Sequence, residues 1–334
     1  MESSTFGNKI KITTCGGSHD KTMSVSIEGL PGGFTIDKSA LTADINRRKP
    51  ADIYGGTPRH EDDIVKVVSG LNDDTTIDNT PLILEFGNNN VRSSDYEAYR
   101  NLYRPGHADF TYDMKYGGIP VGGGRASGRE TLTRVAAGGV IAQILSARYG
   151  ITAESSIDSI GSIPSFDGKI NDEQIALLKD MREKGDSVGG VVNCIIHGLP
   201  AGIGEPVFNK LDAALSYAIM SIGAVKGISF GLGFEAAYNT GSVTNDEFLG
   251  IDNKRLISRN NYHGGILGGI STGEDIIIHV AVKPTPSISI PQHTIDRKGN
   301  PAIIELKGRH DTCIATRIGV VIESMALLAI ANFL

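Results

Sequence analysis

The chain has 334 residues, of which 40% are hydrophobic and 21% charged, so it is long enough for a sizeable core and has the composition of a globular protein. Its formal net charge of −6 argues against a nucleic-acid partner, and no apolar run reaches the length of a membrane span. The three cysteines, Cys15, Cys194 and Cys313, are far apart, and the N-terminus lacks the apolar core of a secretory signal. These features predict a cytoplasmic protein without a structural metal site.

Strands and helices alternate along the first half of the chain. Asp37 is placed to cap a helix that runs to Ile45 and ends before Pro50. Ser127 and Glu130 fit a capping box, which predicts the start of a long helix that extends to about residue 149. Strands are expected where apolar and polar residues alternate, at 9–14, 23–27, 64–68 and 81–86.

The second half continues in the same style. Helices are expected at 171–184, 206–221 and 314–334, the last of them buried, and strands at 190–197, 228–237 and 275–282. The polar stretch 239–264 has little periodicity, which predicts a long surface loop. No linker divides the chain, and the regular βαβ rhythm of a parallel sheet is missing. We therefore predict one α+β domain over residues 1–334 with antiparallel sheets.

Two short motifs contain histidines placed for acid–base chemistry. Gly16–Asp20 follows a predicted strand and holds His19 between small residues, where it can meet a ligand. Arg104–Asp109 combines a guanidinium, His107 and a carboxylate around a Pro-Gly turn. Each motif also has a simpler interpretation, as a turn whose histidine bonds locally or as a charged surface turn.

Gly122–Glu130 is the strongest signal for phosphate binding, because glycines precede a helix start and Arg125, Arg129 and Arg134 supply charge. The GK[ST] and GxGxxG spacings of nucleotide-binding loops are absent. Arg48 ends the first helix, where a cation can bind an anion or simply complement the helix dipole. A glycine-rich structural turn is the alternative for the loop itself.

Two glycine- or proline-rich segments flank the strand expected at 275–282, and both suit the edge of a planar cofactor or a tight hairpin corner. They are Gly264–Gly273 and Lys283–Ser287. Gly308–Asp311 groups three further ionisable residues before the last helix. The residues therefore indicate a polyanionic ligand, most simply a phosphate ester. The alternatives are a non-catalytic regulator that binds a phosphometabolite, and a nicotinamide dehydrogenase, which the missing fingerprint disfavours.

In this order, the motifs resemble those of the chorismate synthase family over almost the whole chain. The resemblance implies a β-α-β sandwich, with helices between two antiparallel sheets, assembled as a homotetramer. It also implies elimination of phosphate from 5-enolpyruvylshikimate 3-phosphate with reduced FMN, supplied by a separate flavin reductase, and NADPH only as an indirect electron source. The matching segments are Gly16–Asp20, Arg104–Tyr112, Lys115–Gly117, Gly122–Glu130, Thr133–Gly138, Gly185–Gly190, Gly204–Phe208, Met220–Ile222, Ala224–Gly227, Gly264–Gly273, Lys283–Ile288 and Gly308–Asp311.

The same resemblance implies roles for individual residues. His19 corresponds to the acid that protonates the departing phosphate, His107 to a histidine beside the flavin, and Asp311 to the group that passes on the C6 proton of the substrate. The implied substrate ligands are Arg48, Arg134 and Arg309. The implied FMN ligands are Arg125, Ala126, Ser127, Gly223, Ala224, Gly268, Lys283, Pro284, Thr285, Pro286, Ser287 and Arg309.

The chain departs from the family pattern at positions close to these residues, although no implied catalytic group is lost. Gly17 stands where the family has glutamate, and Asp20 could bond to the His19 imidazole. The other departures are Ala51, Tyr54, Gly223 and Thr312.

Overall fold

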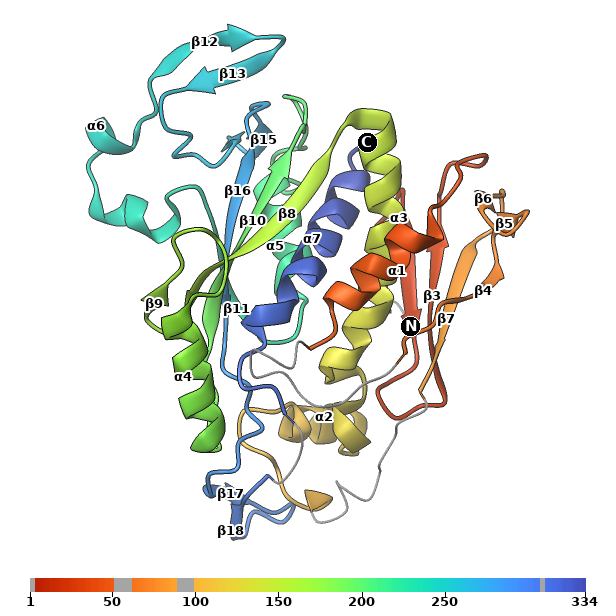
Figure 1. Ribbon diagram of the computed structural model, residues 1–334, viewed down its shortest axis with the longest axis vertical. Helices are drawn as coiled ribbons and strands as arrows, with labels where there is room; N and C mark the ends of the chain where they lie inside the picture. The colour runs from red at the N-terminus through yellow and green to blue at the C-terminus, as the bar shows by residue number, and fades with distance from the viewer. Residues whose placement is uncertain (1–3, 51–61, 89–98, 307–309) are drawn as a thin grey trace.

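Two five-stranded antiparallel sheets enclose a layer of helices in the computed structural model, which describes residues 4–50, 62–88, 99–306 and 310–334 (Figure 1). The first sheet has the order β1 (Thr5–Phe6), β2 (Lys11–Cys15), β3 (Thr22–Glu28), β7 (Leu82–Gly87), β4 (Lys66–Ser69). The second has the order β11 (Val225–Phe230), β16 (Ile276–Val282), β10 (Gly190–His197), β8 (Thr152–Ile160), β9 (Ile163–Pro164). The predicted α+β class and the sandwich of helices between antiparallel sheets are therefore confirmed.

The helical layer is built around α3 and α7, which pack against each other, with α1 and α5 alongside. Helix α3 packs against β2 and β3 of the first sheet and also contacts β8, whereas α7 packs against β8 and β10 of the second sheet. The fold also contains smaller hairpins and helices outside the two sheets and the central helical layer. The helices are α1 (Lys38–Arg47), α2 (Asp109–Tyr116), α3 (Thr131–Tyr149), α4 (Asp172–Glu183), α5 (Leu211–Met220), α6 (Gly241–Thr244) and α7 (Ala315–Ala331). The hairpins are β5 (Leu71–Asn72) with β6 (Thr76–Ile77), β12 (Phe248–Asp252) with β13 (Arg255–Ser258), β14 (Ile266–Leu267) with β15 (Ile270–Ser271), and β17 (Gln292–Ile295) with β18 (Pro301–Ile304).

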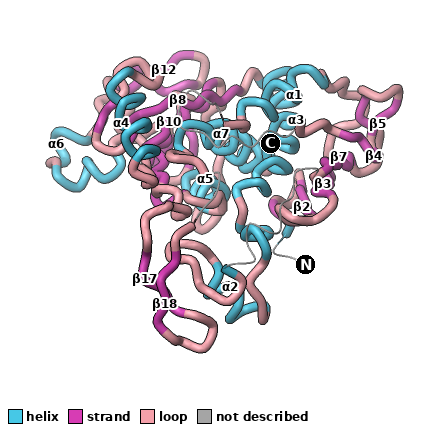
Figure 2. The backbone as a smooth tube through the Cα atoms, turned by 60° about the horizontal axis from the view of Figure 1, so that its bottom comes forward, coloured by secondary structure: helices cyan, strands magenta, loops and turns pink. Residues whose placement is uncertain are grey.

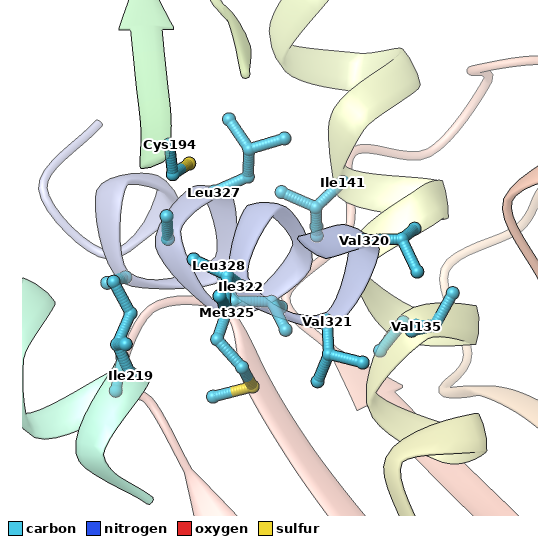
Figure 3. Packing of buried hydrophobic residues seen from close by; sticks show 14 of the residues in the cluster. Val135, Ile141, Cys194, Ile219, Val320, Val321, Ile322, Met325, Leu327 and Leu328 are labelled. Carbon is cyan, nitrogen blue, oxygen red and sulfur yellow. The ribbon is translucent and has the colours of Figure 1, made fainter. Parts of the chain in front are cut away.

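Helix α7 is buried on nearly all sides, as its sequence predicted. Figure 3 shows Val135 and Ile141 of α3, Cys194 of β10 and Ile219 of α5 around it. The two central helices approach closely at Gly138, where an added Cβ would lie 2.2 Å from the Cβ of Ser324. Only glycine fits that contact, so this point fixes how closely α3 and α7 can approach each other.

Local sequence signals placed most of the other predicted elements correctly. The Asp37 carboxylate accepts bonds from the N–H groups of Ser39 and Ala40 at the start of α1. Asn171 and Gln174 form a reciprocal capping box on α4. Strand β3 alternates as expected, since Met23, Val25 and Ile27 face the core.

Four predictions of local structure were wrong. Helix α5 begins only at Leu211, and the strand expected at 228–237 ends at Phe230 and continues as a 3-10 helix. The stretch 239–264 is not an irregular loop, because it contains α6 and the hairpin β12–β13. Ser127 and Glu130 form no capping box: Ser127 caps a 3-10 turn by accepting from the N–H of Arg129, while Glu130 bonds to other side chains.

One end of the molecule, brought forward in Figure 2, holds α2 and the hairpin β17–β18. The two segments are tied together by an ion pair of Arg297 with Asp113 and by a bond from the N–H of Tyr103 to the carbonyl of Ile295. The turn that contains His107 lies between Tyr103 and α2, so this anchoring positions a predicted functional histidine.

Candidate active site

A cavity of about 660 Å³ gathers most of the predicted site residues from distant parts of the chain. Its walls come from the end of α1, the turn before α2, the glycine-rich loop before α3, the segment between α5 and β11, the segment after β16, and the start of α7. The predicted residues that line it are Arg48, His107, Ala126, Ser127, Gly223, Ala224, Lys283, Thr285, Pro286, Ser287 and Asp311.

Aspartates hold the arginines of the cavity in place. Nε and Nη2 of Arg104 each donate to a carboxylate oxygen of Asp109, both at 2.7 Å. Arg317 binds Asp311 in the same way, at 3.2 Å from Nε and 2.6 Å from Nη2. A guanidinium fork held by a carboxylate loses little further rotamer freedom when an anion binds.

Arg48 is buried, yet its Nε has no hydrogen-bond partner among the described residues. Burial lowers the pKa of Arg48 to about 10, and repulsion from Arg317 and Arg129 adds to that effect, against the attraction of Asp63. A buried donor without a partner is unfavourable in the free protein, so this part of the cavity is suited to an anionic ligand.

His107 lies in the cavity wall with both ring nitrogens bonded. Nδ1 is 3.0 Å from the carbonyl of Pro105, and Nε2 is 2.8 Å from Oγ of Ser287. The carbonyl can only accept, so Nδ1 carries the proton and Ser287 donates to Nε2. Burial, followed by the positive charge of Arg104, lowers the pKa of His107 to about 4, and the imidazole is therefore neutral near pH 7.

His19 lies behind the glycine-rich loop rather than among the residues that line the cavity. A Cβ on Gly122 would come within 1.9 Å of its ring, so the loop passes directly over the imidazole. Oγ of Ser18 donates to the carbonyl of Gly122 and therefore accepts from Nδ1 of His19, both at 3.0 Å. The Asp20 carboxylate accepts from the N–H of Gly17, which closes the turn.

The glycine-rich loop has an unusual backbone. Gly122, Gly123 and Gly124 have φ values of 62°, 81° and 51°, a run in the left-handed region that residues with a Cβ would resist. Arg125 does not line the cavity, because its guanidinium donates to the carbonyl and Oγ1 of Thr14 on β2. Ser127 does line it.

The opposite wall is made by two adjacent backbone segments, joined by a bond from the N–H of Lys283 to the carbonyl of Ala224. Lys283 also donates from Nζ to the carbonyl of Gly106, at 2.7 Å. Its pKa is lowered by burial and by the charge of Lys226. Oγ1 of Thr285 is buried and has no partner within the described part of the chain.

Besides His19 and Arg125, three further predicted site residues do not line the cavity. Gly268 lies in the two-residue turn of the hairpin β14–β15, and Pro284 is exposed. Arg134 pairs with Glu130 at 2.8 Å and donates to Oγ of Ser221. Ser221 lines the cavity, so the Arg134 side chain lies behind Ser221 and does not reach the cavity itself. Arg309, with Ala51 and Tyr54, lies outside the described residues.

The structure also brings in residues that the sequence analysis did not name as individual ligands or catalytic groups. Arg129 and His310 lie within the predicted motifs, whereas Arg317 falls in a helix that was interpreted only as core. Asp63 lacked any signal beyond its place in a short acidic run. The pKa of His310 is lowered by burial.

In the described ranges, no group of three or more His, Cys, Asp or Glu side chains is arranged to hold a metal ion. No helix of the described chain is long and apolar enough to cross a membrane. Cys15, Cys194 and Cys313 are free thiols.

The sandwich fold and a cavity lined by arginines, lysines and histidines define an enzyme that acts on a small polyanion. The chain belongs to the chorismate synthase family, whose sequence model matches residues 10–334. It is 45% identical to the chorismate synthase of Lachnoclostridium phytofermentans, over 100% of this chain and 95% of that protein. The chorismate synthase of Azobacteroides pseudotrichonymphae is 40% identical over 98% of both chains. A crystal structure of chorismate synthase superimposes with a TM-score of 0.74 at 26% identity, covering 98% of this chain and 92% of that one.

The protein is therefore a carbon–oxygen lyase that eliminates phosphate from 5-enolpyruvylshikimate 3-phosphate to give chorismate, in aromatic amino acid biosynthesis. The family membership excludes the two alternatives left open by the residues, a non-catalytic regulator and a nicotinamide dehydrogenase.

Proposed function

We propose that the cavity is the active site for the anti-1,4-elimination, carried out with reduced FMN and without net redox change. The observation that carries this proposal is the convergence of His107, Asp311 and the buried Arg48 on one cavity, where Nε of Arg48 has no partner among the described residues. The substrate has a phosphate and two carboxylates, so its site requires several cations to balance the charge.

Arg48 and Arg129 are the substrate ligands that the geometry supports best, because both are buried and both line the cavity. Arg134 acts from behind the wall, through Ser221. Arg309 remains a proposed ligand of substrate and FMN on the strength of the family motif alone.

The opposite wall of the cavity, formed by the segments around Ala224 and Lys283, fits FMN. Thr285 offers a buried hydroxyl without a partner in the described chain, and an added Cβ on Gly223 would meet only the carbonyl of Ala126, at 4.0 Å. Lys283 supplies positive charge beside these two groups. We assign FMN binding to this wall, to Ala126 and Ser127, and to Arg125 and Gly268 by family motif. When bound, reduced FMN lends electron density to the substrate transiently, which no side chain can do.

The hydrogen bonds support the acid–base roles that the family motifs imply. His19, whose Nδ1 bonds to Ser18, protonates the departing phosphate in its imidazolium form, in the role that the family motif implies. Asp311, oriented by the Arg317 fork, takes the C6 proton. His107 is a neutral imidazole before the substrate binds. An anionic ligand beside it raises the pKa of the imidazole and lets it hold a proton.

Anaerobic turnover tests the proposal. Purified protein is mixed with 5-enolpyruvylshikimate 3-phosphate and a substoichiometric amount of reduced FMN, and chorismate formation is followed. Many turnovers per reduced FMN are expected, and none with oxidised FMN in the absence of a reductant. Steady activity with oxidised FMN, or one chorismate for each flavin oxidised, would contradict the proposed use of the cofactor.

The chain acts as one domain, assembled as a homotetramer in the cytoplasm, with reduced FMN from a separate flavin reductase and NADPH only as an indirect electron source. The hairpin β12–β13 supports assembly, because Phe248, Leu249 and Ile251 on β12 are all exposed. A two-stranded hairpin has only marginal stability by itself. The free cysteines support a reducing compartment. Light scattering during size-exclusion chromatography checks the tetramer.

A further inference from the structure

One carboxylate in the cavity is shared by two arginines. Oδ2 of Asp63 accepts from Nη2 of Arg48 at 2.7 Å, and Oδ1 accepts from Nη1 of Arg129 at 2.8 Å. The Asp63 side chain is 1% exposed and each arginine side chain 7% exposed, so the three groups interact with little screening by water. All three line the cavity.

The two arginines depend on Asp63 to different degrees. Arg129 is also held by Oδ1 of Asn88, at 2.7 Å from its Nε, and by the carbonyl of Gly87. In the described chain, the guanidinium of Arg48 has no hydrogen-bond partner other than Asp63, and its Nε is unpaired. Asp63 therefore decides where the Arg48 guanidinium points.

The backbone and the local charge favour an aspartate at this position. Asp63 has a φ of 49°, in the left-handed region that Asp and Asn tolerate better than other residues with a Cβ. Arg48 and Arg129 repel each other, and Arg317 donates to the carbonyl of Arg48 and adds a third positive charge nearby. Without Asp63, these like charges would be buried without their shared counter-ion.

We propose that Asp63 is a positioning and specificity-determining residue: it aims Arg48 and Arg129 at one anionic group of the substrate and keeps inorganic phosphate from occupying the pair. This inference rests on the proposed placement of the substrate in the cavity. With Asp63 ionised, the two arginines present a net charge of about +1 instead of about +2. A small dianion then binds weakly, whereas the whole substrate gains further contacts along the cavity. Weak phosphate binding also favours release of the phosphate that the reaction produces.

The test compares Asp63→Asn with the wild type, using inorganic phosphate as the probe. Calorimetry without FMN measures the phosphate Kd, and steady-state assays with reduced FMN measure competitive inhibition by phosphate, kcat and KM. We expect the Asn variant to bind phosphate about tenfold more tightly or better, since a repulsive buried charge is removed. Its kcat should fall because Arg48 loses its orientation.

Two further variants separate charge from structure. Asp63→Glu keeps the charge and should not tighten phosphate binding. Asp113→Asn removes a different buried aspartate, one that holds Arg297 and Tyr103 and does not line the cavity. It should lower the thermal midpoint without a gain in phosphate affinity. Asp63→Ser provides a second charge-removing variant for the same measurements if Asp63→Asn does not fold.

An unchanged or weaker phosphate Kd in a folded charge-removing variant would overturn the role of Asp63, as would equal tightening in Asp63→Glu. Failure of the proposed function has a different signature. In that case, phosphate and substrate would not compete for the wild-type protein, whatever the variants do.

Discussion

His107 and Ser287 are 180 residues apart in the sequence, and their side chains meet in the cavity wall with 2.8 Å between Nε2 and Oγ. The opposite ring nitrogen faces the carbonyl of Pro105, so the serine hydroxyl donates to the imidazole. This arrangement fixes one neutral tautomer of His107 and aligns its plane before any ligand binds.

Replacement of Ser287 by alanine should slow turnover, because Nε2 of His107 loses the donor that orients it. We expect kcat to fall about 10- to 100-fold, within the range for a misplaced acid–base group, and Ser287→Thr to restore most of it. Ser289→Ala is the matched control, since that serine donates weakly to the carbonyl of Leu306 and does not line the cavity. Equal losses in both alanine variants would contradict a specific role for Ser287.

Stability should depend on pH through the buried histidines. Burial depresses the pKa of His107 to about 4 and also lowers that of His310, so between about pH 4 and 6.5 the unfolded chain binds more protons than the folded one. The free energy of unfolding should therefore rise with pH across this window and level off above it. Urea unfolding at steps of about half a pH unit between about pH 4.5 and 8 measures the slope.

His107→Gln should flatten that slope, because it removes the group with the larger depression of pKa. His293→Gln, which removes an exposed imidazole on β17, is the matched control for loss of a histidine. The explanation fails if both variants change the slope equally, or if stability is highest at the acid end of the window.

Arg129 and Arg134 should differ in their effect on substrate binding. Loss of a charged hydrogen bond is worth about 1.5–3 kcal/mol, so Arg129→Gln should weaken substrate binding by about 10- to 150-fold. Arg134→Gln should have a smaller effect, because that side chain reaches Ser221 instead of the cavity. Titration of both variants with substrate decides between them, and a larger loss in the Arg134 variant would reverse the assignment.

Thr285→Val should make the free protein more stable and its FMN binding weaker. The substitution keeps the side-chain shape and removes a buried hydroxyl that lacks a partner in the described chain, a group whose desolvation costs about 1–3 kcal/mol. Thermal unfolding without ligand and anaerobic titration with reduced FMN give the two measurements. If FMN affinity is unchanged, Thr285 is not a ligand of the cofactor.

Local sequence signals were sufficient where the structure depends on neighbours in the chain. The caps of α1 and α4, the alternation in β3 and the apolar run of α7 each follow from contacts within a few residues. The hairpin β12–β13 was missed because every residue of β12 is exposed, and an exposed strand lacks the alternation that identifies half-buried ones. The Ser127 prediction failed because Glu130 bonds to Thr14 and Arg134 instead of the cap.

By itself, the sequence determined the α+β class, the family, and the glycine- and arginine-rich motifs that supply the site. Only the tertiary structure decided which charged residues face the cavity. Arg129 and Arg134 belong to one motif, yet the first bonds to Asp63 in the cavity and the second to Glu130 behind its wall. Positions five apart near a helix start point in different directions, so what each side chain meets depends on the elements packed around it. Asp63 carried no motif at all: its importance arises because folding places it between two arginines.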